Sequence, residues 1–370
     1  MGGVASFNYN IINYSRLIKK FHSRVVLLKA KEDTRPVFTD KFEADEVITF
    51  HFSNKENHYY IQQRLNELLG NKEGAIVTDN AFTIQAARRF SNPKTVFNLI
   101  HDFFYVSQNI QAGTLVDVAI AHSSFFSDAV FAADPSSFAG RAFYIPYGVK
   151  QLPALPSKKN DSLQLVFLGR LDEGKGVLLL HNINDQLKQK GIKVHWTVIG
   201  KGSLEKKLHK QWKDENNIKF SQPASTDEVY AILREQDIFV FPTSFEGTPV
   251  SILECMSNAV VTIVNDLPGG IRDIVKEEIG FRCQLNNAPE FTAHIATLHH
   301  DRALLKKMQL ASFTAAQQQY DITRNADCYF ELFLQYQQYR RSGKKEPDKM
   351  SRLDKKGFSN RLVKTIRNLK

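Results

Sequence analysis

Short apolar segments alternate with amphipathic stretches along the first part of the chain. Each apolar segment has the length of a buried strand, and the stretches between several of them have helical spacing. Strands separated by helices cannot pair as tight hairpins, so the pattern predicts a mainly parallel sheet. The predicted strands are Glu46–Phe50, Ala75–Thr78, Thr95–Ile100, Val116–Ala121 and Ala142–Ile145.

The same alternation begins again after Pro153, Pro156 and a polar linker over residues 157–162. It predicts two doubly wound α/β domains, over residues 1–150 and 160–318, whose ligand sites lie beyond the carboxyl ends of the strands and face a shared cleft. The segment near residues 150–160 is a candidate hinge. The predicted strands of the second domain are Leu163–Leu168, Val194–Ile199, Ile218–Phe220, Ile238–Phe241, Val260–Val264 and Gly280–Cys283.

The N-terminus departs from this alternation. Met1 to Val4 lead directly into a segment with helical spacing that extends to Lys20, and no apolar strand comes before it. We therefore expect the first strand of the first domain to be missing. Either the start codon is placed too late or the chain truncated, or the natural protein lacks this strand.

Composition and charge narrow the function classes. Of the 370 residues, 42% are apolar, and the three cysteines form no CxxC pair. These values exclude a disulfide scaffold and a cysteine zinc cluster. No apolar run is long enough to span a bilayer and no secretory signal is present, so a cytoplasmic protein is expected.

Most of the net charge lies at the C-terminus. Residues 340–370 contain twelve Lys or Arg and three acidic residues, which leaves only +1 of the net charge of +10 for the rest of the chain. Phe358, Leu362, Val363 and Ile366 recur at helical spacing among these basic residues. An anionic membrane surface is the expected partner of residues 355–370, which would make the protein peripheral on the inner face of the membrane. The alternatives are a disordered solubilising tail and an RNA-binding tail; the body shows no general nucleic-acid character.

A strand, a turn and a helix start are predicted in succession over residues 241–254. The amide groups at a helix start are suited to a phosphate, and the residues here are Gly247, Thr248, Pro249 and Val250. Glu246 and Glu254 would repel a phosphate placed directly on them, so hydroxyl groups of a sugar and of a ribose are the better partners. Alternatively, Glu254 caps or pairs elsewhere.

A second constellation lies between the first strand and helix of the second domain. The interval from Gly169 to Lys175 has P-loop spacing, but Gly176 stands where that motif needs Ser or Thr to hold magnesium. What remains is Arg170 and Lys175 on one loop, a pair suited to neutralising a pyrophosphate. Alternatively, these cations are solvated beside Asp172 and Glu173.

These motifs, with Ile199–Gly202 and Pro268–Asp273 in the same order, resemble the donor domain of family-4 retaining glycosyltransferases of the GT-B fold. The resemblance implies that Arg170 and Lys175 bind the donor pyrophosphate. It likewise implies that Glu246 binds the transferred sugar and Glu254 the ribose. The segment of Gly247, Thr248, Pro249 and Val250 would bind the phosphates and sugar through the backbone N–H groups of Gly247, Thr248 and Val250, since proline has none.

The N-terminal half is similar to the same family more weakly. Gly2 and Gly3 resemble its glycine loop at the donor phosphate, and His101 with Asp102 resembles its active-site His-Asp pair. The resemblance implies catalytic roles for His101 and Glu246, although a structural histidine is the alternative for His101. A helix over residues 319–340 would cross back to the first domain, followed by a basic amphipathic tail over 341–370.

Two departures from the family are visible. Ala259 and Val261 replace its usual Gly and Pro, at positions that concern packing. The absent first strand is more serious, because it would leave Gly2 and Gly3 without an anchor.

The sequence contains no Asp-x-Asp pair, so positive side chains and helix N-termini must meet the pyrophosphate charge. We therefore expect a metal-independent hexosyltransferase that needs no cofactor and uses a nucleotide diphosphate sugar as co-substrate, with UDP favoured over GDP. The resemblance implies retention of anomeric configuration. A glycan or lipid-linked acceptor in bacterial envelope polysaccharide synthesis is expected. The alternatives are a non-catalytic GT-B subunit and a GT-B epimerase.

Overall fold

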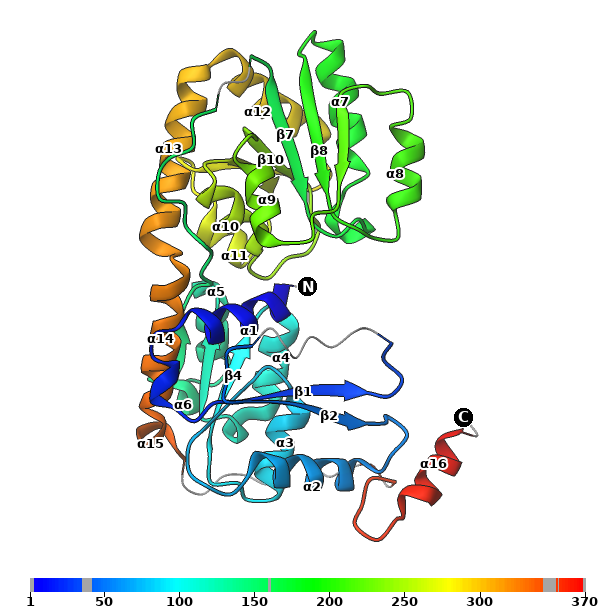
Figure 1. Ribbon diagram of the computed structural model, residues 1–370, viewed down its shortest axis with the longest axis vertical. Helices are drawn as coiled ribbons and strands as arrows, with labels where there is room; N and C mark the ends of the chain where they lie inside the picture. The colour runs from blue at the N-terminus through cyan, green and yellow to red at the C-terminus, as the bar shows by residue number, and fades with distance from the viewer. Residues whose placement is uncertain (1–2, 35–41, 159–160, 342–350, 352, 369–370) are drawn as a thin grey trace. The chain divides into compact units, whose positions relative to one another are not determined.

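The computed structural model describes residues 3–34, 42–158, 161–341, 351 and 353–368. The chain divides into two compact units (Figure 1). Unit 1 comprises residues 1–145 and 323–370, and unit 2 comprises residues 146–322. Every strand pairing in the described part is parallel, so the prediction of parallel α/β domains is confirmed.

Unit 2 contains a six-stranded sheet with the order β12-β11-β10-β7-β8-β9. The order reverses at β7, because the chain proceeds from β7 to β8 and β9 on one side and to β10, β11 and β12 on the other. Its strands are β7 (Leu163–Leu168), β8 (Val194–Ile199), β9 (Ile218–Ser221), β10 (Ile238–Phe241), β11 (Val261–Asn265) and β12 (Gly280–Cys283). Its helices are α7 (Leu179–Gln189), α8 (Glu205–Gln211), α9 (Thr226–Leu233), α10 (Val250–Ser257), α11 (Gly270–Ile274), α12 (Ala288–His300) and α13 (Arg302–Gln319).

Unit 1 contains two parallel sheets in place of the single sheet expected. One sheet pairs β1 with β2, and the other has the order β3-β4-β5-β6. The strands are β1 (Arg24–Ala30), β2 (Glu46–Phe52), β3 (Ala75–Thr78), β4 (Thr95–Ile100), β5 (Val118–Ala121) and β6 (Ala142–Tyr144). The helices are α1 (Gly3–Tyr14), α2 (His58–Leu69), α3 (Ala81–Arg89), α4 (Phe103–Ala112), α5 (Ser124–Ala133), α6 (Pro135–Phe138), α14 (Ile322–Leu334), α15 (Tyr336–Tyr339) and α16 (Asn360–Asn368).

The prediction for the N-terminal region was partly wrong. The helix α1 ends at Tyr14, well before Lys20, and sequence analysis missed β1. The apolar run in β1 is only Val25 to Leu28, between Arg24 and Lys29, and so short a run does not show strand periodicity clearly. No strand precedes α1 within the described residues.

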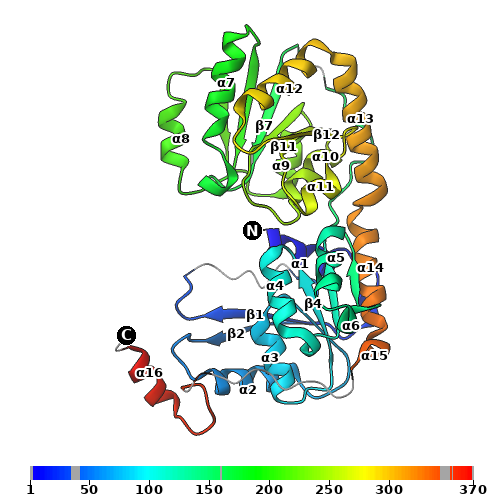
Figure 2. The same cartoon turned by 180° about the vertical axis from the view of Figure 1, so that it is seen from behind.

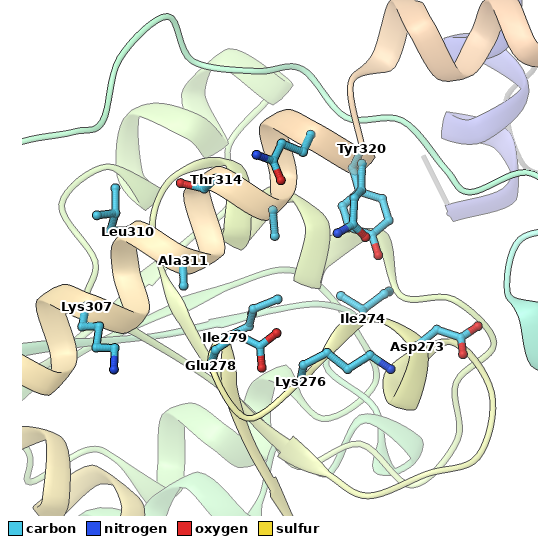
Figure 3. A pocket seen from close by; sticks show the side chains of 13 residues that line it. Asp273, Ile274, Lys276, Glu278, Ile279, Lys307, Leu310, Ala311, Thr314 and Tyr320 are labelled. Carbon is cyan, nitrogen blue, oxygen red and sulfur yellow. The ribbon is translucent and has the colours of Figure 1, made fainter.

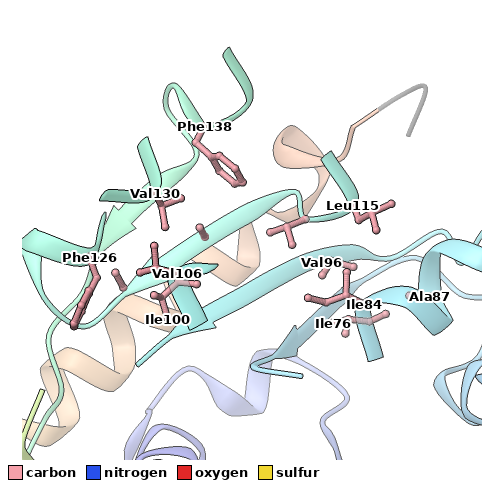
Figure 4. Packing of buried hydrophobic residues seen from close by; sticks show 13 residues of the cluster. Ile76, Ile84, Ala87, Val96, Ile100, Val106, Leu115, Phe126, Val130 and Phe138 are labelled. Carbon is pink, nitrogen blue, oxygen red and sulfur yellow. The ribbon is translucent and has the colours of Figure 1, made fainter. Parts of the chain in front are cut away.

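Apolar side chains from the sheet and helices form the core of unit 1 (Figure 4). Ile76, Val96 and Ile100 of the sheet pack with Ile84 of α3 and Phe126 of α5, and all five are at least 95% buried. From behind, α14 and α15 lie beside α6 (Figure 2), and the hydroxyl of Thr95 on β4 donates to the carbonyl of Tyr336 on α15 at 2.7 Å. The returning C-terminal segment thus belongs to the fold of unit 1.

The predicted hinge segment is bonded to unit 2. The side-chain amide of Gln151 donates to the Tyr320 carbonyl at 2.9 Å, and that of Gln317 donates to the Leu152 carbonyl at 2.7 Å. The buried ammonium of Lys158 donates to the carbonyls of Gln236 and Ala259, and burial lowers its pKa to about 8. The chain therefore passes between the units at residues 145–146 and 322–323. No helix in the described part of the chain is long and apolar enough to cross a membrane.

A buried ion pair joins α3 to the sheet of unit 1. The guanidinium of Arg88 lies 2.5 Å from the Asp117 carboxylate and donates to the Leu115 carbonyl, and both ionic side chains are almost fully buried. The same carboxylate accepts a hydrogen bond from the amide of Val96 at 2.7 Å. The pair therefore fixes α3 against β4 and the start of β5.

We expect Arg88→Met to lower the free energy of unfolding by about 3–5 kcal/mol, because it removes the cation that pairs with a buried carboxylate. Urea denaturation of the full chain measures this change. Lys213→Met, which breaks the exposed pair with Asp214, is the control and is expected to cost less than about 1 kcal/mol. Equal losses in the two variants would contradict the structural role given to Arg88.

Candidate functional site

The loops at the carboxyl edge of the unit 2 sheet touch backbone to backbone. Gly176, in the loop after β7, has a φ of +65°, and a Cβ at this position would lie 1.9 Å from the carbonyl oxygen of Pro242 after β10. A Cβ at Gly270, at the start of α11, would lie 2.6 Å from the carbonyl oxygen of Gly247. Only glycine permits these approaches, so three loops are locked together at this edge.

Hydrogen bonds also join the two central loops. The amide of Ser244 donates to the Gly174 carbonyl at 2.9 Å, and the hydroxyl groups of Thr243 and Ser244 each lie 3.1 Å from the same oxygen. These contacts hold the loop after β7 against the loop after β10. This is the point at which the strand order reverses, where open α/β sheets bind ligands.

The loop packing brings Lys175 onto Glu246. Their ammonium and carboxylate groups form an ion pair, and the two side chains are only 16% and 10% exposed. The hydroxyl of Thr243 lies 3.1 Å from the same carboxylate oxygen, and the Lys175 ammonium lies 5.7 Å from the centre of the Phe241 ring. Two residues predicted to bind different parts of a donor are therefore paired with each other here.

Arg170 is the exposed cation of this loop. Its side chain is 74% exposed, and its guanidinium lies 3.1 Å from the Asp172 carboxylate. The carboxylate of Asp172 also caps the short turn Glu173–Lys175. Arg170 is thus an exposed cation on the same loop as the largely buried Lys175.

The start of α10 supplies groups for an anion. Pro249 occupies the N-cap position and makes no side-chain cap, and Val250 begins the helix. The hydroxyl of Thr248 is buried and has no hydrogen-bond partner in the described part of the chain. The first amide groups of a helix lack internal partners and favour negative charge, so the segment from Gly247 to Val250 is suited to a phosphate.

Glu254 lies on the second turn of α10 and is half-buried. Its carboxylate makes no hydrogen bond or ion pair with any described residue. The side chains of Ser257 and Asn258 donate to the backbone carbonyl of Glu254 instead. Burial raises the pKa of this carboxyl to about 7. A ligand with two neighbouring hydroxyl groups would supply the missing donors.

The raised pKa of Glu254 predicts a pH-dependent stability. The folded chain binds a proton here that the unfolded chain has lost, so stability falls as the pH rises from about 4.5 to about 7, by about 3 kcal/mol at most. In Glu254→Gln this part of the fall is expected to be absent. Urea denaturation at about pH 5 and about pH 8 tests this; identical pH dependence in both proteins would contradict it.

The unit 1 candidate, His101, directly follows β4. Its side chain is 4% exposed, and its Nε2 atom lies 3.3 Å from the Asp79 carboxylate. The rings of Phe7, Tyr105 and His122 surround it, with centroids 5.5, 4.9 and 4.7 Å from the imidazole. The imidazole is therefore enclosed by aromatic rings and faces one carboxylate.

Asp79 is a functional candidate that sequence analysis missed. Asp102, the expected partner of His101, instead caps α4 by accepting from the amide of Phe104 at 2.8 Å. Asp79 follows β3 as His101 follows β4, and these neighbouring strands are parallel. This shared position at the carboxyl edge was the available signal.

A second histidine supports this cluster. Tyr329 of α14 donates to the Ile145 carbonyl at 2.6 Å, and its hydroxyl lies 2.7 Å from Nδ1 of His122. Burial lowers the pKa of His122 well below its usual value, so this imidazole is neutral. Gly3 begins α1, whereas Gly2 lies outside the described residues.

One pocket of about 480 Å³ lies elsewhere in unit 2 (Figure 3). The loop after α11 lines one side with Lys276 and Glu278, and α13 lines the other with Lys307 and Thr314. None of the predicted donor residues lines this pocket.

Two side-chain groups in the described part of the chain could hold a metal ion. Cys283, Glu290 and His294 form one, and His181, Asp185 and Glu215 form the other. Neither contains Glu246 or Glu254. The candidate donor site therefore offers cations and a helix start, and the possible metal ligands lie apart from it.

The comparisons with known proteins agree with this geometry. Residues 151–313 match the family described as "Glycosyl transferases group 1". This match covers somewhat less than half of the chain. It includes Arg170, Lys175, Glu246 and Glu254.

Curated relatives are glycosyltransferases by name. The putative colanic acid biosynthesis glycosyltransferase WcaL of Escherichia coli is 26% identical over 36% of this chain and 35% of its own length. An E. coli α-1,3-galactosyltransferase, named for UDP-Gal and GlcNAc-diphosphoundecaprenol, is 27% identical over 30% of this chain and 29% of its length. The chain spans about a third of the length of these relatives.

Solved structures extend the match to both units. HepE from Anabaena, in complex with UDP and glucose, has a TM-score of 0.70 and 16% identity over 90% of this chain and 96% of its own. The lipopolysaccharide outer core galactosyltransferase WaaB has the same TM-score, identity and coverage. The expected GT-B fold is thereby confirmed.

Proposed function

We propose that this chain is a glycosyltransferase that moves a hexose from a nucleotide diphosphate sugar to a glycan or lipid-linked acceptor in cell-envelope polysaccharide synthesis. The supporting observation is the arrangement in the group 1 domain, where the Lys175–Glu246 pair and the unpartnered Glu254 flank the start of α10. Relatives named for colanic acid and for a diphosphoundecaprenol acceptor support the same process.

Each part of such a donor has a counterpart at this edge. Glu254 receives the ribose diol, and Glu246 receives hydroxyl groups of the sugar. Lys175, Arg170 and the amides from Gly247 to Val250 receive the diphosphate. UDP is the favoured nucleotide, and structural relatives solved in complex with UDP support this choice.

We further propose that transfer is retaining and independent of metal. Positive charge from Lys175, Arg170 and the helix start stabilises the leaving diphosphate, which is the role that a metal plays in other transferases. The acceptor hydroxyl attacks the anomeric carbon from the face that the diphosphate leaves, and a phosphate oxygen takes its proton. No protein nucleophile is needed in this mechanism.

An uncharged surface beside His101 supports an acceptor with an apolar part. Phe103 and Phe104 of α4 and Phe125 of α5 are 39%, 66% and 40% exposed, and the rings of Phe103 and Phe125 lie 5.6 Å apart. Over residues 103–133 the charged residues are Asp117, which is buried, and Asp128. Exposed aromatic patches of this kind bind apolar ligands or surfaces.

The enclosed His101 favours a second candidate, a non-catalytic GT-B subunit that binds the nucleotide sugar without turning it over. The two candidates differ in one measurement. Incubation with UDP- and GDP-sugars in the presence of EDTA is expected to release nucleotide slowly from one donor. Binding without release, with or without acceptor, would instead support the subunit.

Two substitutions separate the donor contacts. Glu246→Ala is expected to abolish sugar transfer without weakening nucleotide binding, because Glu246 is assigned to the sugar. Glu254→Ala is expected to weaken UDP binding by roughly tenfold or more, because it removes the acceptor for the ribose diol. Calorimetry with UDP and a transfer assay measure the two effects. Unchanged sugar transfer by Glu246→Ala would contradict the assignment of Glu246 to the sugar.

A membrane contact through residues 355–370 is also proposed, and α16 is held to unit 1 in this structure. Val363 is fully buried, and Asp354 pairs with Arg367 at 2.8 Å and accepts from the His58 amide at 2.7 Å. Phe358 and Leu362 remain 39% and 46% exposed. Part of the apolar face is thus docked and part is available.

Deleting Gly357 to Lys370 is expected to weaken binding to anionic vesicles, and the difference should shrink at high salt. Asp354→Asn is expected to strengthen it by releasing α16. Glu346→Gln is the control, because it removes one negative charge from the tail just as Asp354→Asn does. Equal sedimentation of the truncated and full chains with vesicles would contradict the membrane contact.

A further inference from the structure

Lys175 and Glu246 form an ion pair at the carboxyl edge of the unit 2 sheet. Each side chain is needed for a different part of the proposed donor, yet in this structure each neutralises the other. Their positions are fixed by the contact of Gly176 with Pro242 and by the hydrogen bond from Ser244 to Gly174. A ligand that engages one of them must therefore compete with the other.

Glu246 depends on this ion pair more than Lys175 does. Glu246 is 10% exposed; burial raises the pKa of its carboxyl, and Lys175 is the main group that opposes this rise. The other neighbour, Thr243, has a single hydroxyl proton and three possible acceptors, the carbonyls of Gly174 and Phe245 and the Glu246 carboxylate. Removing Lys175 would thus leave a buried carboxylate poorly compensated, at a cost typical of a lost charged hydrogen bond.

We propose that the Lys175–Glu246 pair is a latch that selects the complete nucleotide sugar over the free nucleoside diphosphate; this inference rests on the proposed function. A diphosphate alone draws Lys175 away and leaves Glu246 unpaired. The complete donor draws Lys175 away and also supplies sugar hydroxyl groups that donate to Glu246. Binding of the diphosphate is therefore favourable mainly when the sugar is attached.

The latch also acts after transfer. The product diphosphate no longer carries the sugar hydroxyl groups, so the pair forms again and competes with the diphosphate for Lys175. This competition favours release of the product. Glu246 thereby discriminates between substrate and product, because it pairs with Lys175 again once the sugar has left.

Calorimetric titration of the full chain with UDP and with UDP-glucose, in EDTA, tests the latch. Glu246→Gln removes the charge that holds Lys175 and keeps the shape of the side chain. We expect this variant to bind UDP roughly tenfold more tightly than the unmodified chain, and to bind UDP-glucose no more tightly. The preference for the sugar-bearing nucleotide should therefore fall.

Glu173→Gln is the matched control. It removes one negative charge from the loop that carries Lys175, and Glu173 is exposed and forms no ion pair with a described residue. We expect it to change UDP affinity by about twofold at most. An equal gain in both variants would overturn the latch in favour of a general charge effect.

Proton uptake on UDP binding gives a second readout. It is measured on the unmodified chain as well as on the variant. When UDP displaces Lys175, the Glu246 carboxyl takes up part of a proton, which titrations in buffers of different ionisation enthalpy detect. Glu254 titrates in both proteins, so the difference between the unmodified chain and Glu246→Gln isolates Glu246. UDP binding with unchanged affinity and no difference in proton uptake would overturn the latch alone. Absence of UDP binding in every protein would overturn the proposed function together with it.

Discussion

The close contact between the loops after β7 and β10 determines the rest of the candidate site. Gly176 lies against the carbonyl of Pro242 at a distance that no Cβ could occupy. Because β7 and β10 are neighbours at the reversal of strand order, this contact brings together Lys175 and Glu246, which are 71 positions apart in the chain. A side chain at position 176 would separate the loops and break the pair before it altered any ligand contact.

The charges that this packing concentrates limit the ligands that fit. A bare anion would meet Lys175 and the start of α10, but it would also meet two carboxylates, one of them without a partner. A polyol alone would satisfy the carboxylates and leave the unpartnered hydroxyl of Thr248 and the helix amides unused. A molecule that joins a diphosphate to hydroxyl-bearing groups at both ends satisfies all of them, which is the chemistry of a nucleotide sugar.

Sequence patterns predicted the strands of unit 2 closely, because buried parallel strands are nearly continuous apolar runs with glycine-containing turns between them. They identified Glu246, Glu254 and Lys175 through their positions after such strands. The Lys175–Glu246 contact could not be predicted, since it depends on a loop approach that spacing does not report. Likewise β1 was missed because its apolar run is short, and Asp102 was paired with His101 by adjacency, whereas the fold places Asp79 there.

The environment of His101 shows what unit 1 can contribute. An imidazole that is 4% exposed and enclosed by Phe7, Tyr105 and His122 keeps one orientation, with Nε2 facing Asp79. Burial lowers the pKa of His122 well below its usual value, so this second ring adds no positive charge to the cluster. The imidazole lies at the carboxyl edge of the sheet, opposite the Asp79 carboxylate. The exposed aromatic side chains of α4 and α5 lie in residues 103–133, whose charged residues are Asp117, which is buried, and Asp128. This segment suits the apolar part of the proposed acceptor, whereas the donor candidates of unit 2 carry charge.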